Sequence, residues 1–162
     1  MTIQAGDPLP KANFTVMTED GPQVRTTDQI FHGRKVVLFG VPGAFTPLCD
    51  KNHLPGFLAS IDEFRARGID DIAVTSVNDV FVMNAWAKHA GAEGKILFLA
   101  DGNGDFARAI GLSLDLTARG LGQRSQRYAM MVDNGIVRKL NPETASGKVE
   151  TSSAEALLKQ LY

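Results

Sequence analysis

The chain has 162 residues, a formal net charge of −1 at pH 7 and a mean hydropathy of −0.06. Its 44% apolar and 22% charged residues are typical of an ordinary globular protein. This length suits one domain over residues 1–162 with one hydrophobic core, because we find no linker, repeat or low-complexity tract. A basic stripe that would indicate nucleic acid is missing, and no run approaches the ~20 apolar residues of a membrane span.

The first residues contain no cationic segment followed by an apolar one, so we expect no secretory signal. A single cysteine cannot form an internal disulfide, and nothing therefore indicates an oxidising compartment. We expect a cytoplasmic protein, although a removed transit peptide would leave no trace in this sequence.

Apolar periodicity predicts alternating strands and helices over the first two thirds of the chain. The predicted strands cover residues 14–17, 23–26, 35–40, 72–77 and 96–100. The predicted helices cover residues 47–67, with a kink or a restart at Pro55-Gly56, then 80–89 after an Asn78-Asp79 cap, and 106–110.

The last third of the chain is less regular. Residues 112–126 are polar and contain glycine, so we predict a long loop with one turn of helix. Asp133-Asn134-Gly135 predicts a hairpin between strands 128–133 and 136–140, and 141–150 is a predicted loop. Ser152 and Glu155 match a capping box for a last helix that ends near residue 161. The whole pattern predicts an α/β fold with a mixed central sheet flanked by helices.

Cys49, the single cysteine, follows a buried strand at a predicted helix start. Thr46 suits the N-cap and Pro47 the first helical position, which puts Cys49 at the third. There the positive end of the helix dipole favours the thiolate, the nucleophilic form of cysteine. The alternative is a buried cysteine that acts as a small hydrophobic residue.

A thiolate needs a compensating cation, and Arg124 and Arg127 come just before the strand at 128–133. Either guanidinium could reach the helix start, or both could be solvated surface charges. His53 lies four residues after Cys49 on the same helical face, either as a base for the thiol or as a packing residue. His32 and His89 give no metal-ligand spacing with Cys49, so no metal is expected.

Residues 42–49 read Pro-Gly-Ala-Phe-Thr-Pro-Leu-Cys and resemble the peroxiredoxin signature. The likeness is to the peroxiredoxin-5 or type II subfamily and extends along nearly the whole chain. Further matching blocks are His53-Leu54-Pro55-Gly56-Phe57, Ser76-Val77-Asn78-Asp79, Glu93-Gly94-Lys95, Leu99-Ala100-Asp101-Gly102 and Arg124-Ser125-Gln126-Arg127-Tyr128-Ala129-Met130.

The resemblance implies a thioredoxin-like fold and reduction of hydrogen peroxide and organic hydroperoxides, without a cofactor. It assigns the peroxidatic role to Cys49, supported by Thr46, Pro42 and Arg127. It places Gly43, Phe45 and Arg124 at the substrate site, and it implies a homodimer.

The chain departs from relatives that carry a second, resolving cysteine. Thr75-Ser76 and residues 149–152 occupy the two places where that cysteine is found in the family. We therefore expect a one-cysteine cycle, in which an external thiol attacks the sulfenic acid of Cys49. The donor most often implied is glutathione with glutaredoxin. Thioredoxin, or a disulfide between two Cys49 residues, is an alternative.

Two other functions compete with a thiol peroxidase. One is a redox-sensing partner or holdase on the same fold, which would not need Thr46, Cys49 and Arg127 together. The other is a cysteine hydrolase that uses Cys49 and His53, which would need a third group to orient the histidine.

Overall fold

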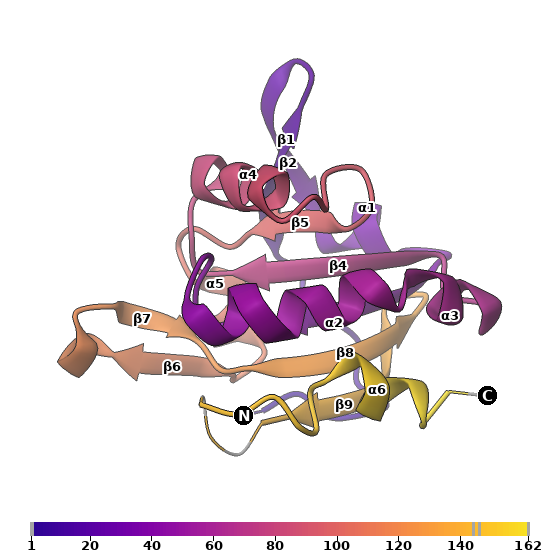
Figure 1. Cartoon of the computed structure of the whole chain (residues 1–162). Coiled ribbons are helices and arrows are strands. Elements are labelled where there is room, and N and C mark those ends of the chain that lie inside the picture. Colours follow the sequence, from indigo (N-terminus) through magenta and orange to yellow (C-terminus); the bar gives the residue numbers. More distant parts are fainter. Residues whose placement is uncertain (1, 144, 146, 162) are drawn as a thin grey trace.

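The computed structural model describes residues 2–143, 145 and 147–161. In this part of the chain a seven-stranded sheet has the order β2-β1-β5-β4-β3-β8-β9, and β6 and β7 form a separate ribbon (Figure 1). The strands are β1 Asn13–Thr18, β2 Gly21–Thr26, β3 Lys35–Gly40, β4 Asp71–Ser76, β5 Leu97–Ala100, β6 Ser113–Leu116, β7 Gly122–Ser125, β8 Tyr128–Asp133 and β9 Ile136–Pro142.

Short helices connect the strands. They are α1 Thr27–Phe31, the π-helix η1 Cys49–His53, α2 Leu54–Ala59, α3 Ile61–Ala66, α4 Val80–His89, α5 Asp105–Ala109, the 3₁₀ helix η2 Thr117–Arg119 and α6 Ala154–Leu158. None of the helices in the described ranges combines the length and the apolar character that crossing a membrane requires.

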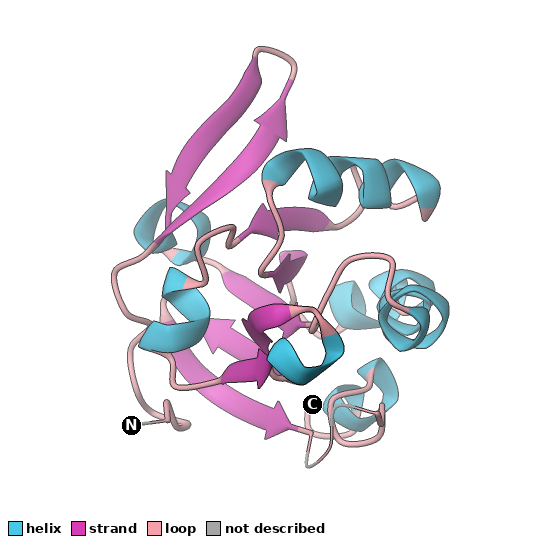
Figure 2. Cartoon of the chain, turned by 90° about the vertical axis from the view of Figure 1, so that its left-hand side faces the viewer, coloured by secondary structure: helices cyan, strands magenta, loops and turns pink. Residues whose placement is uncertain are grey.

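The central sheet is mixed, as the sequence predicts. β3 pairs with β4 and β4 with β5 in parallel, whereas β3–β8, β8–β9, β1–β2 and β1–β5 are antiparallel. Helices cover both faces of the sheet (Figure 2), which is why Val36 through Gly40 of β3 are all buried. Successive side chains of β3 enter opposite cores: Val37 and Phe39 pack in one cluster, and Val36 and Leu38 pack in the other.

Gly40, the last residue of β3, allows a close approach to β8. A Cβ atom at this position would lie 2.2 Å from Cε1 of Tyr128, so only glycine lets the tyrosine ring pack against the end of the strand. At the other end of β8 the predicted hairpin is confirmed. Asn134 and Gly135 have φ angles of 50° and 79°, which a two-residue hairpin turn requires.

The predicted turn of helix within residues 112–126 is present as η2, but the prediction that the rest is loop is wrong. β6 and β7 pair antiparallel and extend away from the main sheet in Figure 1, joined by η2. Most of their side chains are half-buried or exposed, so this ribbon lacks the apolar alternation by which a strand is identified. Helix α1 was also not predicted, although Thr26 and Gln29 form a capping box at its start.

The long helix after Thr46 restarts near Pro55, as predicted, because α2 begins at Leu54 with Pro55 in its first turn. Before it lies the π-helix η1, in which the Leu54 N–H bonds to the Cys49 carbonyl. Proline has no N–H to bond back along the helix, and the wider turn before it accommodates that lack. A second break, which was not predicted, comes at Ser60 between α2 and α3.

Candidate active site

The loop between β3 and the helical run is held in place by one hydrogen bond within it and one to Asn78, which lies between β4 and α4. The Thr46 hydroxyl donates to the Gly43 carbonyl at 2.7 Å, and the Ala44 N–H donates to Asn78 Oδ1 at 2.9 Å. The helical run begins at Pro47, so Cys49 occupies the predicted third position. Thr46 precedes the helix as expected, but its hydroxyl donates back into the loop.

Arg127 lies directly beside the only cysteine. Its Nη2 donates to Cys49 Sγ at 3.2 Å, from a guanidinium whose residue is only 3% exposed. A fixed positive charge at hydrogen-bond distance stabilises a thiolate. The alternative of a solvated surface arginine is therefore wrong for Arg127, and Cys49 is more than a small hydrophobic residue of the core.

Cys49 itself has no accessible surface, and it belongs to the apolar cluster that also contains Val41, Leu54 and Phe57. The sequence leads us to expect a sulfur within reach of small oxidants. In this conformation the whole residue, sulfur included, is closed off from solvent. A peroxide can reach the sulfur only when neighbouring residues move.

His53 links Arg127 to the C-terminal segment. Its Nε2 lies 2.8 Å from the Ser152 carbonyl oxygen, and its Nδ1 lies 3.1 Å from Arg127 Nη1. A carbonyl only accepts and a guanidinium only donates, so Nε2 carries the proton and Nδ1 accepts. Burial lowers the pKa of His53 to about 3. The positive charge of Arg127 also lowers this pKa, whereas the hydrogen bond to the Ser152 carbonyl raises it.

This geometry decides between the two interpretations of His53. The lone pair of Nδ1 is occupied by Arg127, and the ring is neutral at physiological pH, so His53 is not a base for the thiol. The ring packs against Phe39 and Phe57 at 5.0 and 5.5 Å, as a packing histidine would, but it also holds Arg127.

Arg124 contacts the loop of the site. Its Nε donates to the Leu121 carbonyl at 2.8 Å, and its Nη1 lies 3.5 Å from the Pro42 carbonyl oxygen. A Cβ atom on Gly43 would come within 3.0 Å of the same guanidinium, so glycine lets Arg124 lie against the loop.

Phe45 lies at the outer edge of the loop. It is 43% exposed, has a φ angle of 64°, and its ring is 5.5 Å from His89 and 6.4 Å from Trp86 of α4. The Trp86 Nε1 donates to Asp50 Oδ1 at 2.9 Å, which ties α4 to η1.

The sequence analysis did not identify Glu143 and Ser152 as part of this arrangement. Glu143 follows β9, and its carboxylate accepts from the Ser152 N–H at 2.9 Å. Ser153, not Ser152, caps α6, and the residue three positions on is Ala156, so the predicted capping box does not form. No local signal marks these contacts, since the Ser152 carbonyl and His53 are 99 residues apart in the chain.

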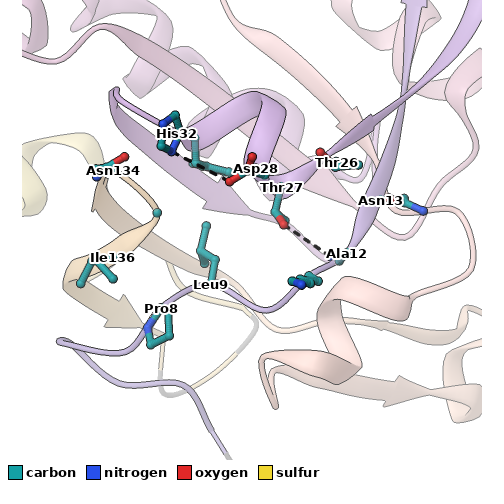
Figure 3. A pocket seen from close by; sticks show the side chains of 13 residues that line it. Pro8, Leu9, Ala12, Asn13, Thr26, Thr27, Asp28, His32, Asn134 and Ile136 are labelled. Atoms are coloured by element: carbon teal, nitrogen blue, oxygen red, sulfur yellow. Dashed lines mark hydrogen bonds and ion pairs between the residues drawn. The ribbon is translucent and has the colours of Figure 1, made fainter.

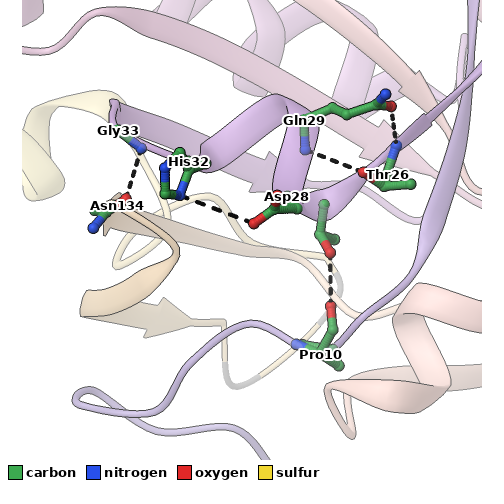
Figure 4. Close-up of polar contacts among 8 residues, drawn as sticks. Pro10, Thr26, Asp28, Gln29, His32, Gly33 and Asn134 are labelled. Carbon is green, nitrogen blue, oxygen red and sulfur yellow. Dashed lines mark hydrogen bonds and ion pairs between the residues drawn. The ribbon is translucent and has the colours of Figure 1, made fainter.

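A separate pocket of about 740 Å³ lies at the opposite end of β3, between residues 8–13, α1 and the β8–β9 turn (Figure 3). Its polar groups mostly bond to backbone nearby: the Thr27 hydroxyl donates to the Pro10 carbonyl, and the Gly33 N–H donates to Asn134 Oδ1 (Figure 4). Among the residues the structure describes, no cluster of three histidine, cysteine or acidic side chains could hold a metal ion.

Comparison with known proteins agrees with the geometry around Cys49. The sequence profile of the family described as Redoxin matches residues 4–158. Peroxiredoxin-2C of Oryza sativa subsp. japonica is 46% identical over 160 residues, which cover 98% of each chain. The structure of reduced Prx3 from Vibrio vulnificus in complex with hydrogen peroxide is 47% identical, with a TM-score of 0.94 over 99% of this chain and 100% of that one.

Peroxiredoxin 5 from Alvinella pompejana is 36% identical, with a TM-score of 0.85 over 97% of this chain and 96% of that one. The fold is therefore the thioredoxin-like fold of redoxins, as the sequence resemblance implies. With its single cysteine, buried beside Arg127, the chain belongs to the peroxiredoxins, as a thiol peroxidase of the type II subfamily whose peroxidatic residue is Cys49.

Proposed function

We propose that Cys49 reduces hydrogen peroxide and organic hydroperoxides in a one-cysteine cycle, and that glutathione with glutaredoxin returns it to the thiolate. The main observation in support is the distance of 3.2 Å between Arg127 Nη2 and the Sγ atom of Cys49, the single cysteine of the chain. It supplies positive charge where a thiolate forms, and an intrachain disulfide has no second cysteine to use.

In the first step the Cys49 thiolate attacks one peroxide oxygen in line with the O–O bond. The S–O bond forms as the O–O bond breaks, and the departing oxygen takes up a proton to leave as water or an alcohol. Cys49 becomes a sulfenic acid, oxidised by two electrons while the peroxide is reduced by two. Charge builds on the departing oxygen, so donors aimed at it stabilise the transition state more than the ground state.

The roles of the surrounding residues belong to the same proposal. Arg127 and the Thr46 hydroxyl donate to the peroxide oxygens, with backbone N–H groups near Gly43. For this, the Thr46 hydroxyl must exchange its bond to the Gly43 carbonyl for one to the substrate. Pro42 shields the sulfur, and Arg124 holds the loop through the Pro42 carbonyl.

Recycling requires two external thiols. The first attacks the sulfenic sulfur and releases water, which leaves a mixed disulfide on Cys49. The second attacks that disulfide and frees the thiolate. Because this cycle needs a pool of reduced thiols, we propose that the protein works in the cytoplasm.

We also propose a homodimer. Phe45 and Phe81 are 43% and 65% exposed, and large apolar side chains left in water support a protein contact. The ring of Phe45 packs toward α4, and Phe81 lies in the first turn of that helix.

The test of this function is peroxide turnover by the reduced protein with two purified donor systems, compared side by side. Glutathione with glutaredoxin should sustain turnover, and mass spectrometry after one equivalent of peroxide should show one added oxygen on Cys49. Faster turnover with thioredoxin would contradict the proposal that glutathione with glutaredoxin is the donor. A dimer linked by a disulfide between two Cys49 residues would contradict the proposal that the donor reacts with a sulfenic acid.

A further inference from the structure

Glu143 is an acidic side chain that the peroxide chemistry above does not use, and it is almost fully buried at 8% exposed. It follows the last residue of β9, and its own N–H donates to the carbonyl of Arg127 at 2.8 Å. A buried carboxylate is unfavourable unless its oxygens accept several hydrogen bonds, so its partners indicate what it does.

Donors from three consecutive residues converge on the Glu143 carboxylate. Oε2 accepts the N–H of Glu150 and the N–H of Ser152, both at 2.9 Å, and the Ser152 hydroxyl at 2.5 Å. Oε1 accepts the N–H of Thr151 at 3.4 Å, and the Thr151 hydroxyl lies 3.2 Å from Oε1 but closer, at 2.9 Å, to the Pro142 carbonyl oxygen. Burial raises the pKa of Glu143, but these bonds, from Ser152 first, outweigh it and lower the pKa. The carboxylate is therefore held ionised.

These contacts form a closed ring that starts and ends at Arg127. The Arg127 carbonyl accepts from the Glu143 N–H, and the Glu143 carboxylate fixes Ser152. The Ser152 carbonyl accepts from His53 Nε2, and His53 Nδ1 accepts from the Arg127 guanidinium. The same guanidinium donates its other nitrogen to Cys49.

We propose that Glu143 is a positioning residue for the peroxidase reaction, which fixes the carbonyl of Ser152 so that His53 holds Arg127 against the sulfur. The inference rests on the thiol-peroxidase activity of Cys49. Glu143 acts through Ser152 and His53, and it contacts neither the peroxide nor the sulfur.

The ring explains why a distant carboxylate affects the sulfur. His53 presents a lone pair to Arg127 only while its proton is on Nε2, and the Ser152 carbonyl is what keeps the proton there. When the segment at residues 150–152 loses its anchor, the carbonyl shifts, His53 can exchange its tautomer, and Arg127 loses its hydrogen bond to His53. A small misplacement of a catalytic group lowers rates strongly.

The first experiment compares Glu143→Gln with the wild type in a single-turnover reaction with hydrogen peroxide, which needs no reductant. The amide keeps the size of the side chain, but it has one acceptor oxygen where the carboxylate has two. We expect the second-order rate constant of Cys49 oxidation to fall by roughly tenfold to a hundredfold. Rates are scaled to the folded fraction from circular dichroism.

The matched control is Thr151→Val, which removes a hydroxyl that contacts the Glu143 carboxylate and the Pro142 carbonyl but leaves Ser152 in place. Its rate should stay within about twofold of the wild type. Should Glu143→Gln not fold, Ser152→Ala takes its place, because it removes only the hydroxyl bond to Oε2. It should then give a smaller rate loss and a shifted tautomer, and a wild-type rate and tautomer would overturn the proposal.

Two further measurements separate positioning from general support of the fold. Nitrogen-15 NMR of His53 should show Nε2 protonated in the wild type and a mixture of tautomers in Glu143→Gln. This readout needs no peroxide, so it tests the ring even if turnover fails. In a His53→Asn background, which breaks the ring, adding Glu143→Gln should change the rate less than about twofold. An equal loss in both backgrounds, or an unchanged tautomer, would overturn the proposal.

Discussion

Polar groups are buried and bonded to one another at one end of strand β3, and they are exposed to solvent at the other end. At the Gly40 end, a guanidinium, an imidazole and a thiol are buried together and bond to one another across 74 and 78 residues of chain. At the Lys35 end, the wider pocket of about 740 Å³ is lined by groups such as Asp28 and His32, whose side chains are 89% and 74% exposed.

This difference shows that the volume of a pocket does not locate chemistry in this fold. Polar groups stay buried only when they are paired, and burial lowers the pKa of His53 to about 3, which keeps this ring neutral beside the Arg127 charge. The open pocket at the other end solvates its charges, which weakens their effect on one another. Five changes test whether this contrast holds, starting with the largest expected effect.

Cys49→Ser should abolish peroxide reduction, with a loss of roughly 10⁴-fold or more, because the hydroxyl is not ionised where a thiolate is. Circular dichroism should show an intact fold, since serine is close in size to cysteine. The measurement is peroxide consumption with excess thiol. Turnover retained by the variant would remove Cys49 as the nucleophile.

Arg127→Ala should slow Cys49 oxidation by roughly 10²-fold to 10³-fold, because the sulfur and the departing oxygen both lose their cation. Stopped-flow measurement of Cys49 oxidation by hydrogen peroxide tests this. Arg138→Ala, at an exposed arginine of β9, is the control and should leave the rate unchanged. A wild-type rate in Arg127→Ala would contradict the proposed role of the contact.

Thr46→Val should slow the same reaction by roughly tenfold to a hundredfold, because the loop loses its bond to the Gly43 carbonyl and the peroxide loses a donor. Thr46→Ser keeps the hydroxyl and is expected to retain most of the rate. Stopped-flow measurement of Cys49 oxidation distinguishes them. Equal rates for the two variants would mean that the hydroxyl has no part in the reaction.

Acid should unfold the protein in a window set by His53. The folded state holds this ring neutral down to about pH 3, whereas the unfolded chain protonates it near pH 6.5. Protons therefore bind preferentially to the unfolded state, and the free energy of unfolding should fall by up to about 1.4 kcal/mol per pH unit below 6.5. Glu143, whose pKa is lowered, acts in the same direction, because its stabilisation is lost as the pH falls through its folded-state pKa.

Urea unfolding of the wild type and of His53→Asn at several pH values measures this effect. The variant cannot take up a proton at residue 53, so its stability should depend less steeply on pH. Identical slopes would contradict the buried, neutral state of His53.

Asp28→Asn and His32→Gln, in the pocket at the other end of β3, should have the smallest effect. Their side chains are exposed and 4.0 Å apart, so we expect stability to change by no more than about 0.5 kcal/mol and Cys49 oxidation to stay within about twofold. The same stopped-flow assay tests this. A loss comparable to that of Thr46→Val would erase the contrast between the two ends of the strand.

Much of the fold was predictable because its signals are local. A few adjacent residues are enough to identify β3, by its uniformly apolar run, and the turn at Asn134-Gly135. The β6–β7 ribbon was not predicted, since pairing between two mostly polar segments leaves no apolar pattern in the sequence. That residues 1–162 form one domain stays a prediction.

The site divides in the same way. Pro42, Thr46 and Cys49 lie in one contiguous motif, and their spacing on a strand-to-helix turn is visible without coordinates. Arg127 could be named only through the family resemblance, because nothing near it in the sequence distinguishes it from Arg124. The structure separates the two: one guanidinium contacts the sulfur, and the other contacts the Pro42 carbonyl.

The sequence by itself determined the nucleophile and the alternation of strands and helices, because both depend on neighbours a few residues away. Only the tertiary structure decided the tautomer of His53, the partner of Arg127 and the place of Glu143. The reason is physical: a hydrogen bond between groups far apart in the chain forms only after the sheet has brought them together, and one of these bonds runs to a backbone carbonyl, which every residue carries.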